Sequence, residues 1–271
     1  MAEAMDACRS GYYEWVRHGC GRVKREQYEK DFAVILAAFE DTRRTYGPRR
    51  LAKHLHQQGH LLSRMRVQRL MRENGLVPKT VRKFIATTNS CHDYPAAPNI
   101  LNRNFIVVRP NMAWVSDITY VATGEGWLYL AAVMDLFSGK IVGWAMDKQM
   151  TSTLVCDALR QAIGRTNPPS AVICHSDRGV QYACRTYRAL LKRHRFVQSM
   201  SRKGNCWDNA PMESFFGTLK TELIYHEDYQ TRRQARSSIF EYVESFYNRV
   251  RIQEKLGYQS PEIYESLSFS A

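Results

Sequence analysis

The sequence of 271 residues has no long apolar run, and no stretch approaches the roughly 18 apolar residues that a membrane-spanning helix needs. Its first residues, MAEAMDACRS, lack the charged-then-apolar pattern of a signal peptide. Both absences favour a cytoplasmic protein that makes no membrane contact. Hydrophobic residues still make up 44% of the chain, which supports a packed core and excludes a disordered protein.

Metal-ligand and disulfide patterns are also missing. The seven cysteines are an odd number, are scattered and include no Cys-x-x-Cys, so reduced and mostly buried thiols are expected. The segment HLHQQGH contains His54, His56 and His60, but their spacing does not place three ligands on one helix face. The sequence therefore disfavours both a disulfide framework and a zinc site.

Acidic residues are scarce in one part of the chain. Residues 43–83 contain 12 Lys or Arg and a single acid, Glu73, within a chain whose net charge is +13. A basic block on a helix-patterned segment indicates a polyanionic partner, most often nucleic acid. The alternative is a solvated basic surface that only aids solubility.

Helical patterns fill residues 1–83. Apolar residues recur at helical spacing over 27–47, where Gly47-Pro48 is predicted to end the helix. A short helix follows over 49–59, and another over 63–75 has Ser63 as its expected N-cap. Two short helices joined by a tight turn predict a helix-turn-helix unit at about residues 45–76.

The second of these helices has two chemically different faces. When each residue advances by about 100°, Val67, Leu70 and Met71 share one face and arginines occupy the other. Such a helix can lie against DNA. The candidate DNA contacts in this region are Arg49, Arg50, Arg64, Arg66, Arg69 and Arg72.

Residues 84–110 are predicted to be a linker, and after them the apolar period changes to two. Strands are expected over 112–123, 127–138 and 141–147, and their short connections predict an antiparallel meander. Alternating helices and strands follow, ending in a helix from Pro211. The pattern predicts a mixed α/β sheet with flanking helices over 111–225 and a helical C-terminal extension over 226–271.

Three acids are candidates for chemistry. Asp117 lies inside the first strand, where a carboxylate is costly to bury unless it is paired or binds a metal. Asp177 ends a buried strand, and Glu213 lies on the first turns of a helix. Each also has an ordinary explanation: a solvent-facing strand position, a turn residue and an acid favoured by the helix dipole.

Nearby acids and a histidine compete with these candidates. Asp208 and Glu222 flank Glu213, and Asp135 is read as a turn residue. Asn209 and Asp208 are read as loop and cap residues before the helix. His175 lies two residues before Asp177, so in a strand both side chains would point to the same face, and a structural role is expected for His175.

Spacing distinguishes among the acids. Asp117 and Asp177 are separated by 59 residues, and Asp177 and Glu213 by 35. With the blocks HSDRGVQY, SRKGNCWDNAPMESFFGTLKTE and YNRVRIQEKLGYQSP, this pattern resembles the bacterial insertion-sequence transposases of the orfB type, within the superfamily that includes retroviral integrases. The resemblance covers about residues 8–265. Gln253 departs from the histidine of many relatives, and no zinc module of the retroviral kind is present.

The resemblance implies an RNase H-like fold with a five-stranded mixed sheet. It implies that Asp117, Asp177 and Glu213 are catalytic and hold two Mg²⁺ ions, with Mn²⁺ able to substitute, and that Asp117 bridges both ions. Lys220 lies nearly on the face of Glu213 and resembles the basic residue of the family that contacts DNA; the alternative is a solvated lysine. The loop KGNCWDNA is predicted to be a mobile lid.

The implied reaction is cleavage of double-stranded DNA at the element's ends and transfer of the 3′-OH to a phosphodiester. The alternatives are a nuclease of the same fold that does not join DNA, and a DNA-binding regulator without catalysis. The resemblance also implies a homo-oligomer, at least a dimer, and an upstream-frame partner or fusion, since no sustained heptad run is present in this sequence. Such a protein would act in the bacterial cytoplasm, associated with the nucleoid through DNA.

Overall fold

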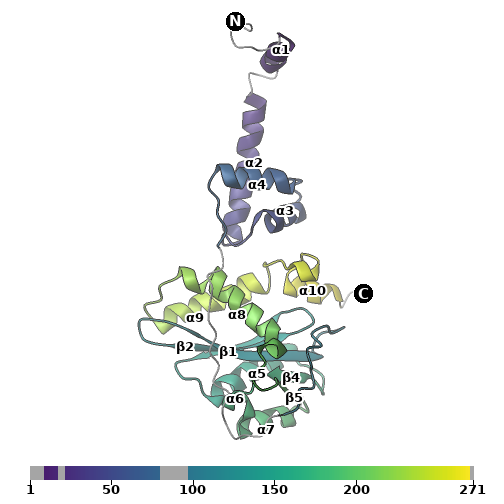
Figure 1. The fold of residues 1–271 in the computed structure, drawn as a ribbon, viewed down its shortest axis with the longest axis vertical. Helices are drawn as coiled ribbons and strands as arrows, with labels where there is room; N and C mark the ends of the chain where they lie inside the picture. Colours follow the sequence, from purple (N-terminus) through teal and green to yellow (C-terminus); the bar gives the residue numbers. More distant parts are fainter. Residues whose placement is uncertain (1–8, 18–21, 80–96, 269–271) are drawn as a thin grey trace. The chain divides into compact units, whose positions relative to one another are not determined.

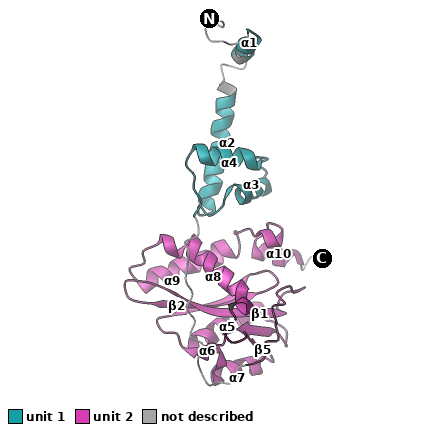
Figure 2. Ribbon diagram, viewed as in Figure 1, with its two compact units in different colours: residues 1–79 teal, residues 80–271 magenta. Residues whose placement is uncertain are grey.

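The computed structural model describes residues 9–17, 22–79 and 97–268. The chain divides into two compact units, residues 1–79 and 80–271 (Figure 2). The predicted linker at 84–110 lies partly outside the described residues, and the predicted domain bounds stay predictions. In the described ranges, no helix is both long enough and apolar enough to cross a membrane.

The N-terminal unit is helical. Its helices are α1 (Arg9–Arg17), α2 (Arg22–Asp41), α3 (Pro48–Gln57) and α4 (Arg64–Glu73) (Figure 1). Helices α2, α3 and α4 bury their apolar faces together, as the 3.6-residue spacing predicts. The fully buried side chains of this core include Ile35, Tyr46, Leu51, Leu55, Val67 and Leu70.

The end of α2 differs from the prediction. The helix stops at Asp41, six residues before Gly47. Thr42 donates its hydroxyl to the carbonyl oxygen of Ala38 at 2.8 Å, and the next two residues, Arg43 and Arg44, both have φ of 57°. Two consecutive left-handed residues cannot continue a right-handed helix. Pro48 instead occupies the first turn of α3, a position that suits its fixed φ.

The N-terminus of α4 confirms the predicted cap. The Ser63 hydroxyl accepts a hydrogen bond from the backbone N–H of Arg66 at 3.2 Å. The turn that joins α3 to α4 contains Gly59 at φ +88°, a conformation that favours glycine. Val67, Leu70 and Met71 are buried, so the apolar face of this helix is the one that the sequence predicts.

The second unit is built on one five-stranded sheet with the order β3-β2-β1-β4-β5. Its strands are β1 (Ala113–Val121), β2 (Leu128–Asp135), β3 (Ile141–Asp147), β4 (Ile173–Ser176) and β5 (Val197–Met200). Strands β1 to β3 form the predicted antiparallel meander, and β4 and β5 run parallel to β1. The mixed sheet confirms the predicted fold class.

Helices cover both faces of this sheet (Figure 1). On one face lie α5 (Ser152–Thr166), α6 (Val180–Ala183) and α7 (Arg185–Arg193), and on the other lie α8 (Ala210–Glu222) and α9 (Arg232–Glu241). In the C-terminal extension, α9 continues as a π-helical turn, Tyr242–Tyr247, and α10 (Pro261–Ser268) follows.

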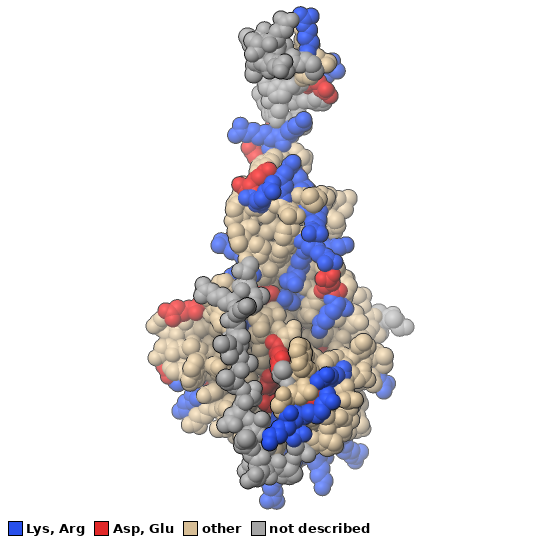
Figure 3. Space-filling view, in the orientation of Figure 1, with Lys and Arg blue, Asp and Glu red and all other residues tan. Residues whose placement is uncertain are grey.

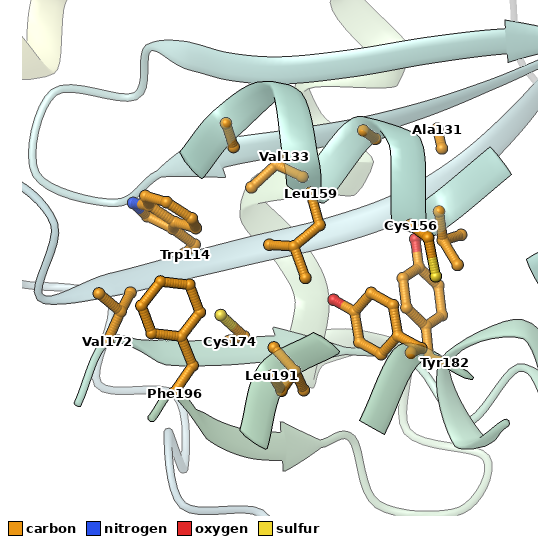
Figure 4. Packing of buried hydrophobic residues seen from close by; sticks show 14 of the residues in the cluster. Trp114, Ala131, Val133, Cys156, Leu159, Val172, Cys174, Tyr182, Leu191 and Phe196 are labelled. Atoms are coloured by element: carbon orange, nitrogen blue, oxygen red, sulfur yellow. The ribbon is translucent and has the colours of Figure 1, made fainter. Parts of the chain in front are cut away.

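The main core of this unit lies between the sheet and α5 to α7 (Figure 4). Trp114 of β1 packs edge-on against Phe196, with ring centroids 5.7 Å apart. Gly143 lets α5 approach β3 closely, since a Cβ at that position would lie 2.2 Å from the carbonyl oxygen of Ala158. Cys156 and Cys174 are buried free thiols in this core, as expected. Helix α8 lies on the opposite face of the sheet from this core.

Candidate active site

The register of two parallel strands brings the first two acids together. β1 pairs with β4 through Ser116 and Ser176; Asp117 is the next residue of β1, and Asp177 directly follows the end of β4. Neighbouring strands lie about 4.8 Å apart, so the two acids leave the end of the ladder side by side. Asp117 has the parity opposite to that of Trp114, whose side chain faces the α5–α7 core, and its charge interacts with Glu213 and Lys220 of α8, so it points to the α8 side of the sheet.

Helix α8 brings the third acid. The side-chain Nδ2 of Asn209, at the N-cap of α8, donates to the carbonyl oxygen of Ser116 at 3.2 Å. Ser116 directly precedes Asp117, and Glu213 lies one helical turn after Asn209. Asn209 was predicted to be a loop and cap residue, but its side chain bonds the strand and caps no helix N–H.

Apolar residues hold α8 against the sheet. Met212, Phe215 and Phe216 are buried, and Phe215 contacts the Tyr247 ring with centroids 4.8 Å apart. Glu213 lies among them in sequence but is exposed. The helix is therefore anchored by its apolar face while its one first-turn acid remains accessible.

The three carboxylates influence one another. Burial raises the pKa of Asp117 well above its ordinary value, and the negative charges of Asp177 and Glu213 raise it further. The backbone N–H of Ile118, which donates to Asp117 Oδ1 at 2.8 Å, acts in the opposite direction. The Glu213 side chain is accessible, but partial burial of its carboxylate raises its pKa. Asp177 Oδ1 accepts from the N–H of Gly179 at 2.9 Å, which fixes its orientation.

Lys220 is not a solvated lysine. It is 8% exposed, and its ammonium lies over the Tyr120 ring, 5.1 Å from the centroid. Burial lowers its pKa, while the negative charge of Asp117 raises it. A partly desolvated positive charge therefore lies beside Asp117. The DNA contact of Lys220 stays a prediction.

Asp208 has a structural environment. It is fully buried, and its carboxylate accepts from Arg202 Nε and Nη2 at 2.9 and 2.6 Å, from Arg103 Nε at 2.8 Å and from Asn99 Nδ2 at 2.9 Å. The hydrogen bonds from Arg202 hold its pKa well below the ordinary range, against the opposing effect of burial. Asp208, near the end of the KGNCWDNA loop, therefore ties that loop to Arg202 just before it and to the segment near residue 100.

Glu222 also has a structural role, because other side chains bind its carboxylate. It is buried and accepts two parallel hydrogen bonds from Arg251, Nη2 to Oε1 at 2.8 Å and Nε to Oε2 at 2.9 Å. The Tyr242 hydroxyl donates to the same carboxylate at 2.8 Å. This ion pair joins the C-terminal end of α8 to the C-terminal extension.

His175 has the structural role that was its default. It is fully buried, and its ring nitrogens lie 2.9 Å from Ser199 Oγ and 3.1 Å from Ser201 Oγ. Burial lowers its pKa to about 4, so the ring is neutral at pH 7. Asp135 is a turn residue, as predicted, because Oδ1 accepts from Phe137 N and Oδ2 from Asn111 N.

The donor chemistry of the three acids suits a hard divalent cation. All are oxygen ligands, and the mutual repulsion that raises the pKa of Asp117 is what a bound cation would offset. In the described part of the chain, no three His, Cys, Asp or Glu side chains lie close enough together to enclose a metal ion. The three acids therefore lie near enough for their charges to interact, but they do not surround a metal ion.

Comparisons with known proteins find relatives over almost the whole chain. A family model described as an HTH-like domain matches residues 26–84, and models described as an integrase core domain match residues 107–206 and 213–269. The insertion element IS600 uncharacterized 31 kDa protein of Shigella sonnei is 46% identical over 264 residues, covering 97% of each chain. Transposase InsF for insertion sequence IS3A of Escherichia coli (strain K12) is 42% identical over 267 residues, 98% of this chain and 93% of that protein.

The chain belongs to the insertion-sequence transposases. The family is one of DDE-type polynucleotidyl transferases, which confirms the enzyme class that the acid spacing suggested. A solved intasome of simian T-cell lymphotropic virus, in complex with PP2A regulatory subunit B56 gamma, matches with a TM-score of 0.51. It is 17% identical and covers 81% of this chain and 74% of that one, so it supports the RNase H-like fold alone.

The arginines of this transposase that were predicted to contact DNA are not equivalent. Arg64, Arg69 and Arg72 of α4 are exposed. Arg66 is half-buried, and its Nε donates to Asp31 of α2 at 2.9 Å. The role of Arg66 in holding α4 to α2 was not visible in the sequence, because the two residues are 35 positions apart.

Two further arginines near the start of α3 were candidates. Arg49 is exposed, whereas Arg50 is half-buried with its guanidinium over the Tyr46 ring, 5.1 Å from the centroid. On the face of the N-terminal unit seen in Figure 3, Lys and Arg atoms gather with few acidic atoms among them. This distribution agrees with the basic block read from the sequence.

Proposed function

We propose that this transposase cleaves DNA at insertion-sequence ends and joins the freed 3′-OH to a phosphodiester, with Asp117, Asp177 and Glu213 as its catalytic residues. The observation that carries the proposal is the register of β1 against β4, which sets Asp117 beside Asp177. The bond from Asn209 to Ser116 brings the helix of Glu213 to the same place.

The three carboxylates would hold Mg²⁺, in the proposal two ions, with Mn²⁺ able to substitute. When bound, such cations supply positive charge that stabilises the attacking and leaving oxygens of an in-line displacement at phosphorus. The support for this cofactor is the all-oxygen donor set and the repulsion among its members.

The residues of the chain contribute orientation and charge. The N–H groups of Ile118 and Gly179 each donate to one catalytic carboxylate and fix its rotamer. Lys220 adds a positive charge beside Asp117 that attracts a DNA phosphate and offsets part of the acidic charge. Because Lys220 is buried against Tyr120, that charge is held in one place.

The proposal extends to the partners. Double-stranded DNA of the element ends and of the target is bound in part by the N-terminal unit through its exposed arginines, Arg49, Arg64, Arg69 and Arg72. Two ends must be brought together, so the working form is a homo-oligomer, at least a dimer, joined or fused to an upstream-frame partner. This activity belongs to the bacterial cytoplasm, on the nucleoid.

A strand-transfer assay on end-sequence DNA with Mg²⁺ tests the proposal. Asp117→Asn and Glu213→Gln should each abolish joining. Glu222→Gln is the matched control on the same helix, because Glu222 is bound by Arg251 and should affect stability but not the rate per folded molecule. Full activity in either of the first two variants would refute the assignment.

The products distinguish the alternatives. Hydrolysis without joined products would indicate a nuclease of the same fold. Salt-sensitive DNA binding with no cleavage under Mg²⁺ or Mn²⁺ would indicate a regulator without catalysis.

A further inference from the structure

One buried polar atom at the site has no hydrogen-bond partner. Asn209 is 4% exposed, and among the described residues its Oδ1 belongs to a small group of buried side-chain atoms for which no partner is found. Buried acceptors in folded proteins are paired in the great majority of cases, so such an atom indicates a missing partner. Its Nδ2 is already used, since it donates to the carbonyl oxygen of Ser116.

The orientation of the amide follows from that bond. A carbonyl oxygen requires a donor, so Nδ2 must face Ser116 and Oδ1 must face away from it. The next residue of the strand is Asp117, and one turn along α8 lies Glu213. Asn209 therefore bridges the elements that carry two of the three acids, with its acceptor atom unused.

The chemistry of the surroundings narrows the identity of the missing partner. Asp117, Asp177 and Glu213 are acceptors when ionised, so the partner must be a donor that tolerates a strongly negative site. A water molecule bound to a cation fits, because the metal takes its lone pair and both hydrogens must go to acceptors. Mg²⁺ keeps several waters when carboxylates bind it.

The geometry points to Asn209 as a positioning residue, whose Oδ1 accepts a hydrogen bond from the water shell of a divalent cation held by the three carboxylates. The inference rests on the proposed function. It assigns to Asn209 two separate tasks: its nitrogen ties α8 to β1, and its oxygen orders the hydrated cation. Ordinary structural asparagines lack the second task.

Asn248 is a natural comparison. It is also buried, at 3% exposure, but both ends of its amide are bonded: Oδ1 accepts from the N–H of Ile141 at 2.9 Å, and Nδ2 donates to the Ile141 carbonyl oxygen at 3.0 Å. The same residue type at the same burial is therefore present with the structural task alone.

The test is thermal unfolding of the full chain, followed by circular dichroism, with MgCl₂ titrated at constant ionic strength. Binding to the folded state alone raises the midpoint with ligand concentration, so the titration gives an apparent Mg²⁺ affinity without DNA or turnover. Asn209→Leu should require about 10- to 100-fold more Mg²⁺ for the same shift, the range found when an outer-shell partner of a metal site is removed.

A second variant separates the two tasks. Asn209→Asp keeps an acceptor oxygen but replaces the amide nitrogen that bonds Ser116. It should lower the midpoint without Mg²⁺ yet reach the Mg²⁺-induced shift at or below the wild-type concentration. Asn248→Leu should lower the midpoint and leave the Mg²⁺ response unchanged.

The outcomes are distinguishable. If wild type shifts with Mg²⁺ and Asn209→Leu shifts at the same concentration, the inference is wrong and Oδ1 bonds ordinary water. If Asn209→Asp and Asn209→Leu lose the Mg²⁺ response equally, an acceptor oxygen is not what matters and the inference is also wrong. If wild type shows no Mg²⁺-dependent shift while Asp117→Asn behaves identically, the metal site of the proposed function itself fails.

Discussion

Replacing Asp208 by Asn should destabilise the second unit, residues 80–271, by about 3 kcal/mol. Asp208 is fully buried and receives hydrogen bonds from two arginines, Arg103 and Arg202, and from Asn99. Breaking a buried ion pair by removing one charge costs about 3–5 kcal/mol. The two arginine side chains are 43% and 48% exposed, so solvent screens part of the interaction and the lower end of that range applies.

The sign of the pH dependence follows from the lowered pKa of Asp208. A depressed folded-state pKa contributes stability that is present above the ordinary value of 3.8 and is lost as the pH falls below it. The difference in unfolding free energy between wild type and Asp208→Asn should therefore be constant from pH 6 to 8 and shrink in acid. Urea denaturation followed by circular dichroism measures it at each pH.

Asp157→Asn provides the control for this prediction. Asp157 also pairs with an arginine, Arg160, at 2.6 Å, but the two side chains are 52% and 54% exposed. A surface pair of this kind contributes about 0–1 kcal/mol. A loss below about 1 kcal/mol in Asp208→Asn at pH 7, or a difference from wild type that does not shrink in acid, would refute the account of Asp208 as a buried clamp.

Three further predictions concern the charged residues. Asp117→Asn should raise the free energy of unfolding without metal, because the raised pKa of Asp117 means that its ionised form is disfavoured in the folded state. The gain should appear as the pH rises above 3.8; urea denaturation at pH 4 and pH 8 checks it, and a less stable variant at pH 8 would contradict it. Lys220→Met should weaken binding of end-sequence DNA at all salt concentrations and reduce the salt slope by about 1, whereas Lys220→Arg should retain most of the affinity, as measured by fluorescence anisotropy. Arg69→Gln and Arg72→Gln should also weaken DNA binding and reduce the salt slope by about 1. Arg66→Gln should chiefly lower the thermal midpoint because it breaks the bond to Asp31. Equal losses of DNA affinity in all three variants would show that Arg66 contacts DNA despite that bond.

The sequence was informative where a local pattern determines the structure. Period-two alternation located β1, and Ser63 capped α4 as its residue type predicts. The spacing from Asp177 to Glu213 selected one acid among three on or near α8, and the structure shows Asp208 and Glu222 occupied by arginines. Each of these features is encoded by a short segment of the sequence or by a signature of the family.

Other features depended on partners far apart in the sequence. The distance of 105 residues between Arg103 and Asp208 is not marked by any pattern, and neither is the bond across 93 residues from Asn209 to Ser116. The position of Lys220 along its helix was not enough to predict its burial. Its angular position placed it near Glu213, but its burial against Tyr120 depends on how α8 meets β1.

The short length of β4 has a consequence for the whole sheet. β1 is paired with β2 as far as Val121, but β4 follows it only to Ser116, so the last five residues of β1 have no described strand on that side. Extending β4 by two residues would pair it with the part of β1 that carries Asp117 and would place further backbone beside that carboxylate. If the proposed site is correct, the early end of β4 keeps Asp117 and Asp177 accessible, and an insertion in β4 should be less tolerated than one of equal length in the turn between β1 and β2.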